Sequence, residues 1–167
     1  METIGLGGGC HWCTEAVFLS LRGVLHAAQG WIAAEENESF SEAVIVHYDP
    51  AKINLAVLIA VHLHTHSSTA NHSMRSKYRS ALYVFKKEQL QICAEILNSL
   101  QRDFDKQIVT EILTFHTFRP SAENELNYYY SNPSKPFCQT FIHPKMKILL
   151  EHFSAYAQIN KINRSGR

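Results

Sequence analysis

Over most of its length this sequence lacks glycine, and throughout it lacks an excess of either charge. Six of its seven glycines lie within the first thirty residues, and none occurs between Gly30 and Gly166. Sixteen Lys and Arg residues stand against fifteen Asp and Glu residues, so the net charge is only +1. That balance provides neither a basic face for nucleic acid nor an acidic tail for a basic partner. We therefore expect no nucleic acid among its partners.

Long apolar runs are missing as well. No run reaches the roughly 18 residues of a membrane span, and residues 1–9 lack the charged start and long apolar stretch of a secretion signal. There are four cysteines in 167 residues, a length that can bury its own core, so a reducing compartment is favoured over a disulfide framework. We expect a cytoplasmic monomer that does not bind a membrane.

The hydrophobic pattern predicts alternating strands and helices. Strands are expected over residues 3–8, 24–31, 42–48, 79–85 and 108–115. Helices are expected over residues 12–21, 55–63, 87–104, 124–130 and 144–157, with Asn54 as an N-cap. This order predicts an α+β fold of the ferredoxin-like (split βαβ) type, a two-layer sandwich with a mixed sheet and extra C-terminal helices. We expect one domain over residues 1–157 and a disordered tail over 158–167.

Three consecutive glycines end at Gly9, directly before Cys10, where the first strand gives way to the first helix. Glycine at such a junction permits a tight turn and close approach of a ligand. A cysteine entering a helix meets free backbone N–H groups and the positive end of the helix dipole, both of which favour the thiolate. Cys10 is therefore predicted to have a lowered pKa and to be nucleophilic. Cys13, one turn along, completes a C-x-x-C motif.

The motif alone is compatible with dithiol exchange, with half of a zinc site, or with a thiol reductase; two buried fillers are the structural alternative. Zinc would require a second such pair, which neither Cys93 nor Cys138 provides, so no metal site is predicted. Cys93 falls on the apolar face of the helix expected over 87–104 and is expected to be buried and structural.

The segment GCHWCTEAVF, residues 9–18, resembles the active-site segment of the A-type peptide methionine sulfoxide reductases, typically G-C-F-W-G-x-E. Further segments agree in order and spacing. They are residues 21–24 with 30–31, 42–44 with 48–50, 77–81, and 130–133 followed by Cys138. The match spans about residues 3–140. The chain thus resembles a divergent member of that family, in which the active-site segment reads GCHWC.

This resemblance implies an enzyme that reduces methionine S-sulfoxide, free or in peptides, with no bound cofactor and with thioredoxin or another dithiol as reductant. Cys10 would attack the sulfoxide sulfur. Glu42 would protonate the oxygen, and Tyr78 would donate a hydrogen bond to it. Trp12 would offer a flat apolar wall to the substrate methyl group. Without the resemblance, each of these three side chains has a plain structural interpretation: an ion-paired carboxylate, a half-buried strand tyrosine, or core packing.

Attack would leave Cys10 as a sulfenic acid, which condenses with a nearby thiol. Cys138 matches the recycling position of the family and follows an irregular segment that contains two prolines. Cys13 is the alternative, since it is closer in sequence. We favour Cys138.

Several residues depart from the family pattern. His11 replaces the usual phenylalanine and puts a titratable group beside the thiolate, unless it simply faces solvent. Trp31 and Ser73 complete the expected substrate-binding set, and Ser73 stands where the family commonly has aspartate. The loop after Trp31 is short, and Phe40 has no hydroxyl to replace the second tyrosine that the family's longer loop supplies.

Histidines concentrate at His62, His64, His66 and His72. An H-x-H-x-H pattern can bind a metal, but here it straddles a helix end, where residues two apart do not share a face. We expect these histidines to line the substrate opening or to face water. Two rivals to the reductase remain: a dithiol-disulfide oxidoreductase that uses Cys10 and Cys13, and a non-catalytic family member that binds oxidised methionine or a metal.

Overall fold

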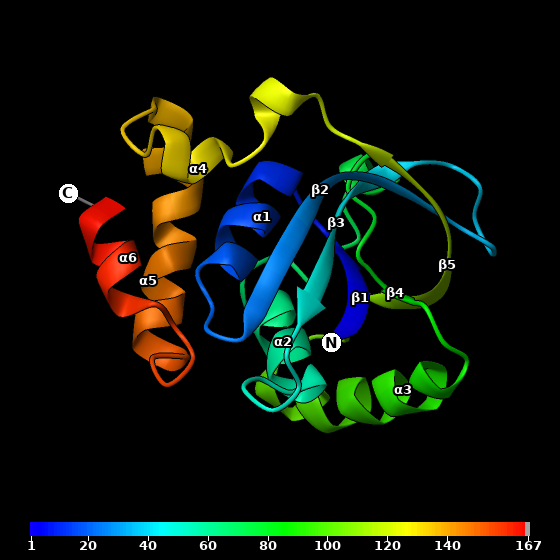
Figure 1. Cartoon of the computed structure of the whole chain (residues 1–167). Helices are drawn as coiled ribbons and strands as arrows, with labels where there is room; N and C mark the ends of the chain where they lie inside the picture. Colours follow the sequence, from blue (N-terminus) through cyan, green and yellow to red (C-terminus); the bar gives the residue numbers. More distant parts are fainter. Residues whose placement is uncertain (166–167) are drawn as a thin grey trace.

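A computed structural model describes residues 1–165 of the 167-residue chain (Figure 1). Within these residues the strands are β1 (Glu2–Gly7), β2 (Val24–Ala34), β3 (Ser41–Tyr48), β4 (Ala81–Val84) and β5 (Glu111–Pro120). The helices are α1 (His11–Leu19), α2 (Leu55–His64), α3 (Glu88–Leu100), α4 (Tyr128–Ser131), α5 (His143–His152) and α6 (Ile159–Ser165). The result is a mixed α+β fold.

The strands close on themselves instead of forming an open sheet. β3 lies between β1 and β2 and is antiparallel to both, β4 is antiparallel to β1, and the order around the barrel is β1-β3-β2-β5-β4. β5 makes the closure, because its first part runs parallel to β4 while its later part pairs antiparallel with β2 out to Pro120. The mixed sheet was predicted, but the open ferredoxin-like sandwich is not confirmed. The expected last strand stopped at residue 115, the first residue that pairs with β2, and so missed the pairing over residues 117–120.

Closure buries both faces of the central strands. In β3, Val44 and Val46 belong to the cluster that packs against the helices, whereas Ala43 and Ile45 belong to a second cluster inside the barrel. Alternate strand residues point to opposite faces, so a strand covered on both sides is apolar throughout. This explains why the sequence of β3 shows no polar alternation.

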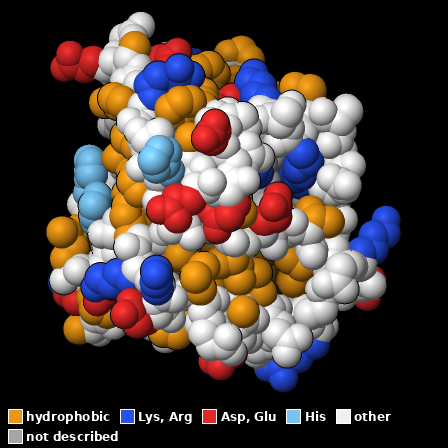
Figure 2. All heavy atoms as spheres, turned by 90° about the vertical axis from the view of Figure 1, so that its right-hand side faces the viewer, with side chains coloured by type: hydrophobic (Ala, Val, Ile, Leu, Met, Phe, Trp, Pro, Cys, Tyr) orange, Lys and Arg blue, Asp and Glu red, His pale blue; other side chains and the backbone are white. Residues whose placement is uncertain are grey.

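The helices fall into two groups around this barrel. α4, α5 and α6 gather beyond α1 on one side, and α3 lies beneath the strands in the view of Figure 1. Asn54 caps α2 as predicted, its side-chain oxygen accepting the Val57 N–H at 2.9 Å. On the face shown in Figure 2, acidic and basic side chains are interspersed, in keeping with the balanced net charge.

The C-terminal part differs most from expectation. A π-helical segment, Cys138–Ile142, precedes α5, which ends at His152 and not at residue 157. The disordered tail expected over 158–167 is wrong for Ile159–Ser165, which form α6 with Ile162 buried in the main core; residues 166 and 167 lie outside the described part. Across residues 1–165, no helix has both the length and the apolar character needed to cross a membrane.

Candidate active site

Cys10 occupies the N-cap position of α1, between β1 and the helix. Its carbonyl accepts the N–H groups of Cys13 at 3.0 Å and of Thr14 at 3.2 Å, and its side chain is partly exposed. The pKa of Cys10 is lowered. A hydrogen bond from the Cys13 side chain contributes most, against the opposing effect of burial, and the backbone N–H groups of Trp12 and Cys13 add to it. The predicted thiolate at the start of the helix is therefore supported by a named set of donors.

The glycines before Cys10 serve close packing. Among the described glycines a positive φ occurs at Gly23 (93°), at the end of the α1 connection, and at none of the three preceding Cys10. A Cβ on Gly8 would lie 2.4 Å from the His66 ring, so a side chain cannot fit there. A Cβ on Gly9 would meet nothing within 4 Å of the described atoms. Gly9 therefore borders open space next to the Cys10 thiol.

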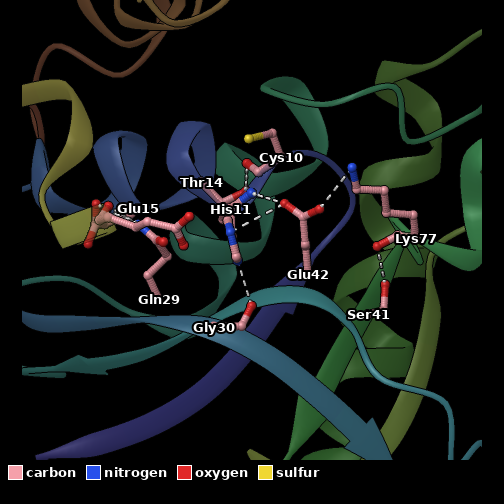
Figure 3. Close-up of polar contacts among 10 residues, drawn as sticks. Cys10, His11, Thr14, Glu15, Gln29, Gly30, Ser41, Glu42 and Lys77 are labelled. Atoms are coloured by element: carbon pink, nitrogen blue, oxygen red, sulfur yellow. Dashed lines mark hydrogen bonds and ion pairs between the residues drawn. The ribbon is translucent and has the colours of Figure 1, made fainter. Parts of the chain in front are cut away.

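Glu42, near the start of β3, is buried beside Cys10 at 5% exposure. Its Oε1 accepts the backbone N–H of His11 at 3.2 Å and lies 3.4 Å from Nε2 of the His11 ring. Its Oε2 lies 3.7 Å from Nζ of the exposed Lys77 (Figure 3). A carboxyl group is thus fixed at the same helix end that carries the nucleophile.

His11 does not face solvent, because its side chain is turned into the protein and is 4% exposed as a residue. Its Nδ1 lies 2.7 Å from the Gly30 carbonyl oxygen on β2. The His11 and Trp31 rings meet edge-on at a centroid distance of 4.9 Å. The Arg119 guanidinium lies over the Trp31 ring, 5.1 Å from its centroid. Trp31 therefore supports His11, and the solvent-facing alternative for His11 is wrong.

Trp12 is stacked by the segment between β5 and α5, residues 121–142, which we call the cover segment. The Tyr128 ring lies parallel to it at 4.0 Å, and Phe137 meets it edge-on at 5.3 Å. Glu15 holds the same segment, since its carboxylate oxygens accept the N–H groups of Asn127 at 3.0 Å and Tyr128 at 3.3 Å. The wall predicted at Trp12 is present, but aromatic rings of this chain already cover part of it.

The loop before β4 brings Tyr78 next to Glu42. The Lys77 carbonyl accepts the Glu42 N–H at 3.0 Å, and the Lys77 ammonium lies 5.1 Å from the centroid of the half-buried Tyr78 ring. Ser73 begins a 3-10 turn earlier in the loop and is exposed; none of the described contacts of Cys10, His11 or Glu42 involves it. The structure brings Tyr78 to the site and leaves Ser73 outside it.

All four cysteines are free thiols. Cys138 is fully buried where the π-helical segment begins, and burial raises its pKa. The pKa of Cys13 is raised strongly, first by its hydrogen bond to Cys10 and then by burial. Both candidate recycling thiols are therefore protonated in the neutral range, whereas the lowered pKa of Cys10 favours its thiolate. Cys93 is buried on α3 as expected, and burial raises its pKa to about 11.

Of the clustered histidines, His62 and His66 lie beneath the glycine turn, whereas His64 is half-buried beside Asp103 and His72 faces water as expected. His62 Nε2 lies 2.8 Å from the Gly7 carbonyl oxygen, and His66 Nε2 lies 2.8 Å from the Ser80 hydroxyl. Burial lowers the pKa of His62 to about 4, so the ring is neutral. Within residues 1–165, no group of three or more His, Cys, Asp or Glu side chains is placed to hold a metal ion.

Three neighbours of the site were not predicted as such. Lys77 faces Glu42, Arg75 donates to the carbonyl oxygens of Gly8 at 3.0 Å and Tyr78 at 2.9 Å, and Tyr128 stacks on Trp12. Lys77 adjoins a segment already singled out, so its position gave a usable signal. The other two contacts join distant segments and leave no local pattern.

Comparisons with known proteins identify the family of this chain. The family model described as peptide methionine sulfoxide reductase matches residues 2–157. A peptide methionine sulfoxide reductase MsrA of Acinetobacter baumannii (strain SDF) is 32% identical over 168 residues, covering 92% of this chain and 96% of the relative.

Solved structures show the same fold. Mxr1 from Saccharomyces cerevisiae in reduced form has a TM-score of 0.72 at 24% identity, covering 82% of this chain and 88% of that one. Mxr1 in complex with Trx2 has a TM-score of 0.61 at 24% identity, covering 76% and 84%. Because the family match covers nearly the whole chain, this protein belongs to the peptide methionine sulfoxide reductases, oxidoreductases that reduce methionine sulfoxide through thiol chemistry.

Proposed function

We propose that Cys10 is the nucleophile and Glu42 the proton donor in the reduction of the S epimer of methionine sulfoxide. The observation that carries this assignment is the position of the Glu42 carboxyl, buried against the N-terminus of the helix that Cys10 caps and bonded to the next residue's N–H. The Glu42 carboxyl is also near enough to Cys10 for its charge to act on the pKa of that thiol. A sulfoxide bound at the open side of Gly9 would then have the nucleophile and the acid as neighbours.

The step balances as follows. The Cys10 thiolate gives an electron pair to the sulfoxide sulfur, and a proton passes to the sulfoxide oxygen, which is a poor leaving group without it. Methionine leaves with its sulfur reduced by two electrons, and Cys10 becomes a sulfenic acid, oxidised by two electrons and carrying the oxygen. We propose that Tyr78 donates a hydrogen bond to the same oxygen, since its ring lies near the Lys77 ammonium that faces Glu42. We propose His11, Trp12 and Trp31 as the aromatic side of the substrate site.

We propose Cys138 as the recycling thiol, which attacks the Cys10 sulfenic acid and releases water. It begins a π-helical segment, a strained form that is frequent at functional sites, within a segment built of short turns. Cys138 is fully buried and lies near enough to Cys13 to raise the pKa of that thiol, so it belongs to the same end of the fold as the C-x-x-C motif. Cys13 remains the second candidate, since its hydrogen bond to Cys10 keeps it close to the sulfur.

Thioredoxin is the proposed reductant of the resulting disulfide, acting by thiol exchange. The support is the solved complex of Mxr1 with Trx2, since this chain shares the fold of Mxr1. Four free thiols support a reducing, cytoplasmic setting for this chain. We propose that it acts as a monomer and without a bound cofactor.

The test uses purified protein, separate S and R epimers of methionine sulfoxide, and dithiothreitol. We expect reduction of the S epimer only, lost in Cys10→Ser and retained in Cys93→Ala, the matched control at a buried cysteine. Sulfoxide reduction by Cys10→Ser, or preference for the R epimer, would overturn the assignment. Insulin disulfide reduction that disappears in Cys13→Ser would instead favour a dithiol-disulfide oxidoreductase.

A further inference from the structure

His11 bridges two groups that together decide where its protons lie. Nδ1 is 2.7 Å from the Gly30 carbonyl oxygen, which can only accept, so Nδ1 carries a hydrogen and donates it. The opposite nitrogen, Nε2, is 3.4 Å from Oε1 of Glu42. In a neutral ring with hydrogen on Nδ1, Nε2 has only a lone pair to present to the carboxyl oxygen.

A lone pair facing a carboxylate is unfavourable at a site where both residues are nearly fully buried, with exposures of 4% and 5%. One proton between Nε2 and Oε1 removes that repulsion. It can reside on His11, giving an imidazolium beside a carboxylate, or on Glu42, giving a carboxylic acid beside a neutral ring. The two forms differ only in which side of a 3.4 Å gap holds the proton.

Other charged groups around the pair leave this proton in place. On the α1 side, the Cys10 thiolate lies next in sequence, and Glu15 is near enough for the His11 charge to lower its pKa, although burial raises that pKa more. From the loop before β4, the Lys77 ammonium faces the other carboxyl oxygen but stays exposed. On the strand side, Trp31 separates His11 from Arg119. The acidic side chains near the ring are therefore Glu42, at 3.4 Å, and Glu15, while Lys77 lies on the other oxygen of Glu42.

We infer that His11 and Glu42 share one proton and that His11 supplies the proton that Glu42 gives to the sulfoxide oxygen. This inference rests on the proposed function of Glu42 and adds a positioning residue to it. Attack by the Cys10 thiolate draws the shared proton through Glu42 to the oxygen, where it becomes the hydrogen of the sulfenic acid. The pair is left as a neutral ring and a carboxylate, and it takes up a proton from solvent before the next turnover.

The kinetic test compares wild type with His11→Asn, which can still donate to the Gly30 carbonyl but does not titrate. The rate of the first turnover is measured as a function of pH, with exposed His152→Gln on α5 as the control variant. We expect the alkaline decline of the rate in His11→Asn to begin about one or more pH units lower than in wild type. The ratio of the wild-type rate to the His11→Asn rate should then rise about tenfold per pH unit across that interval. A ratio that stays constant with pH would mean that His11 only packs, and would overturn the inference.

A second readout needs no activity. In the reduced wild-type protein at about pH 7.5, well above the usual titration of histidine, the ¹⁵N signal of His11 and the ¹³C signal of the Glu42 carboxyl report their protons directly. We expect either the His11 Nε2 or the Glu42 carboxyl to carry a proton in wild type and, in Glu42→Gln, the His11 Nε2 to carry none. A wild-type protein in which both the His11 Nε2 and the Glu42 carboxyl lack a proton would refute the shared proton even if the enzyme were active. An inactive wild type with a protonated pair would instead refute the proposed function alone.

Discussion

Cys10 and Cys138 lie in segments that the fold holds very differently. Cys10 caps α1, and that helix end is fixed by backbone hydrogen bonds, by Glu42 and by tight packing around the glycine turn. Cys138 follows the short turns of the cover segment, one of which begins at Asn127 in the left-handed region (φ 54°). The Cys138 thiol packs in the main core and donates a long hydrogen bond of 3.6 Å to the Asn132 carbonyl.

This difference matches the two kinds of chemistry. A nucleophile that must meet its substrate and a proton donor in one geometry benefits from a rigid junction. A recycling thiol has to approach the Cys10 sulfur after the first step, and a segment made of short turns can adjust more readily than a long helix. The comparison predicts that substitutions at the junction impair the first chemical step, whereas substitutions in the cover segment impair the later steps.

The largest effect is expected at the junction. Glu42→Gln should slow the first turnover on the order of 10²–10⁴-fold, because the amide has no acidic proton to give. Rapid-quench measurement of methionine formation gives this rate. Glu36→Gln, at an exposed carboxylate that binds the Thr114 N–H at 2.8 Å, should leave the rate unchanged. A Glu42→Gln rate close to that of wild type would remove the acid from the mechanism.

The next effect separates the two segments. Cys138→Ser should keep the first turnover within about twofold of wild type while thioredoxin-supported turnover falls at least roughly tenfold. Both rates come from one assay, followed with and without thioredoxin and its reductase. Peptide mapping after a single turnover should find Cys10 linked to Cys138. A Cys10–Cys13 disulfide, or a slow first turnover in Cys138→Ser, would break the comparison.

A smaller effect concerns the pH dependence of the Cys10 thiol. Because the folded site lowers its pKa, Cys10 is a thiolate above that pKa and a slow-reacting thiol below it, and the alkylation midpoint lies under the value of about 8.5 for a free cysteine. Cys13→Ala removes the largest cause of the lowering, so the midpoint should move to higher pH. Iodoacetamide labelling of Cys10 across a pH series measures it, with Cys138→Ser as the reference. An unshifted midpoint would mean that the backbone donors suffice.

The smallest effect tests how the cover segment is held. Asn127→Ala places an alanine in the left-handed region at a cost of about 1 kcal/mol, whereas Asn127→Gly should be close to neutral. Hydrogen exchange should then be faster over residues 121–142 in the alanine variant and unchanged at the Cys10 junction. Equal acceleration in both regions would show that they open together.

Part of this picture was accessible from the sequence. Glycines before a cysteine predict a strand-to-helix junction, and the family resemblance predicts Glu42 and Tyr78 beside it. Glu42 contacts that junction directly, whereas Tyr78 lies next to Lys77, whose ammonium faces Glu42. Closure of the barrel was not accessible, because it depends on β5 pairing with two strands at once. The environment of His11 was equally out of reach, since it is created by a β2 carbonyl and a β3 carboxyl that only tertiary structure assembles.

The last helix of the described residues contacts the end of α1 opposite to Cys10. As the chain enters α6, the Gln158 side chain donates to the carbonyls of Leu19 at 3.1 Å and Leu21 at 3.3 Å, and Lys161 donates to Leu19 at 3.1 Å. These carbonyls lie at the opposite end of α1 from Cys10, where the helix dipole is negative and a cation is stabilising. The family match ends at residue 157, one residue before these contacts begin. A segment that lies just beyond the family match therefore holds the end of α1 opposite to Cys10.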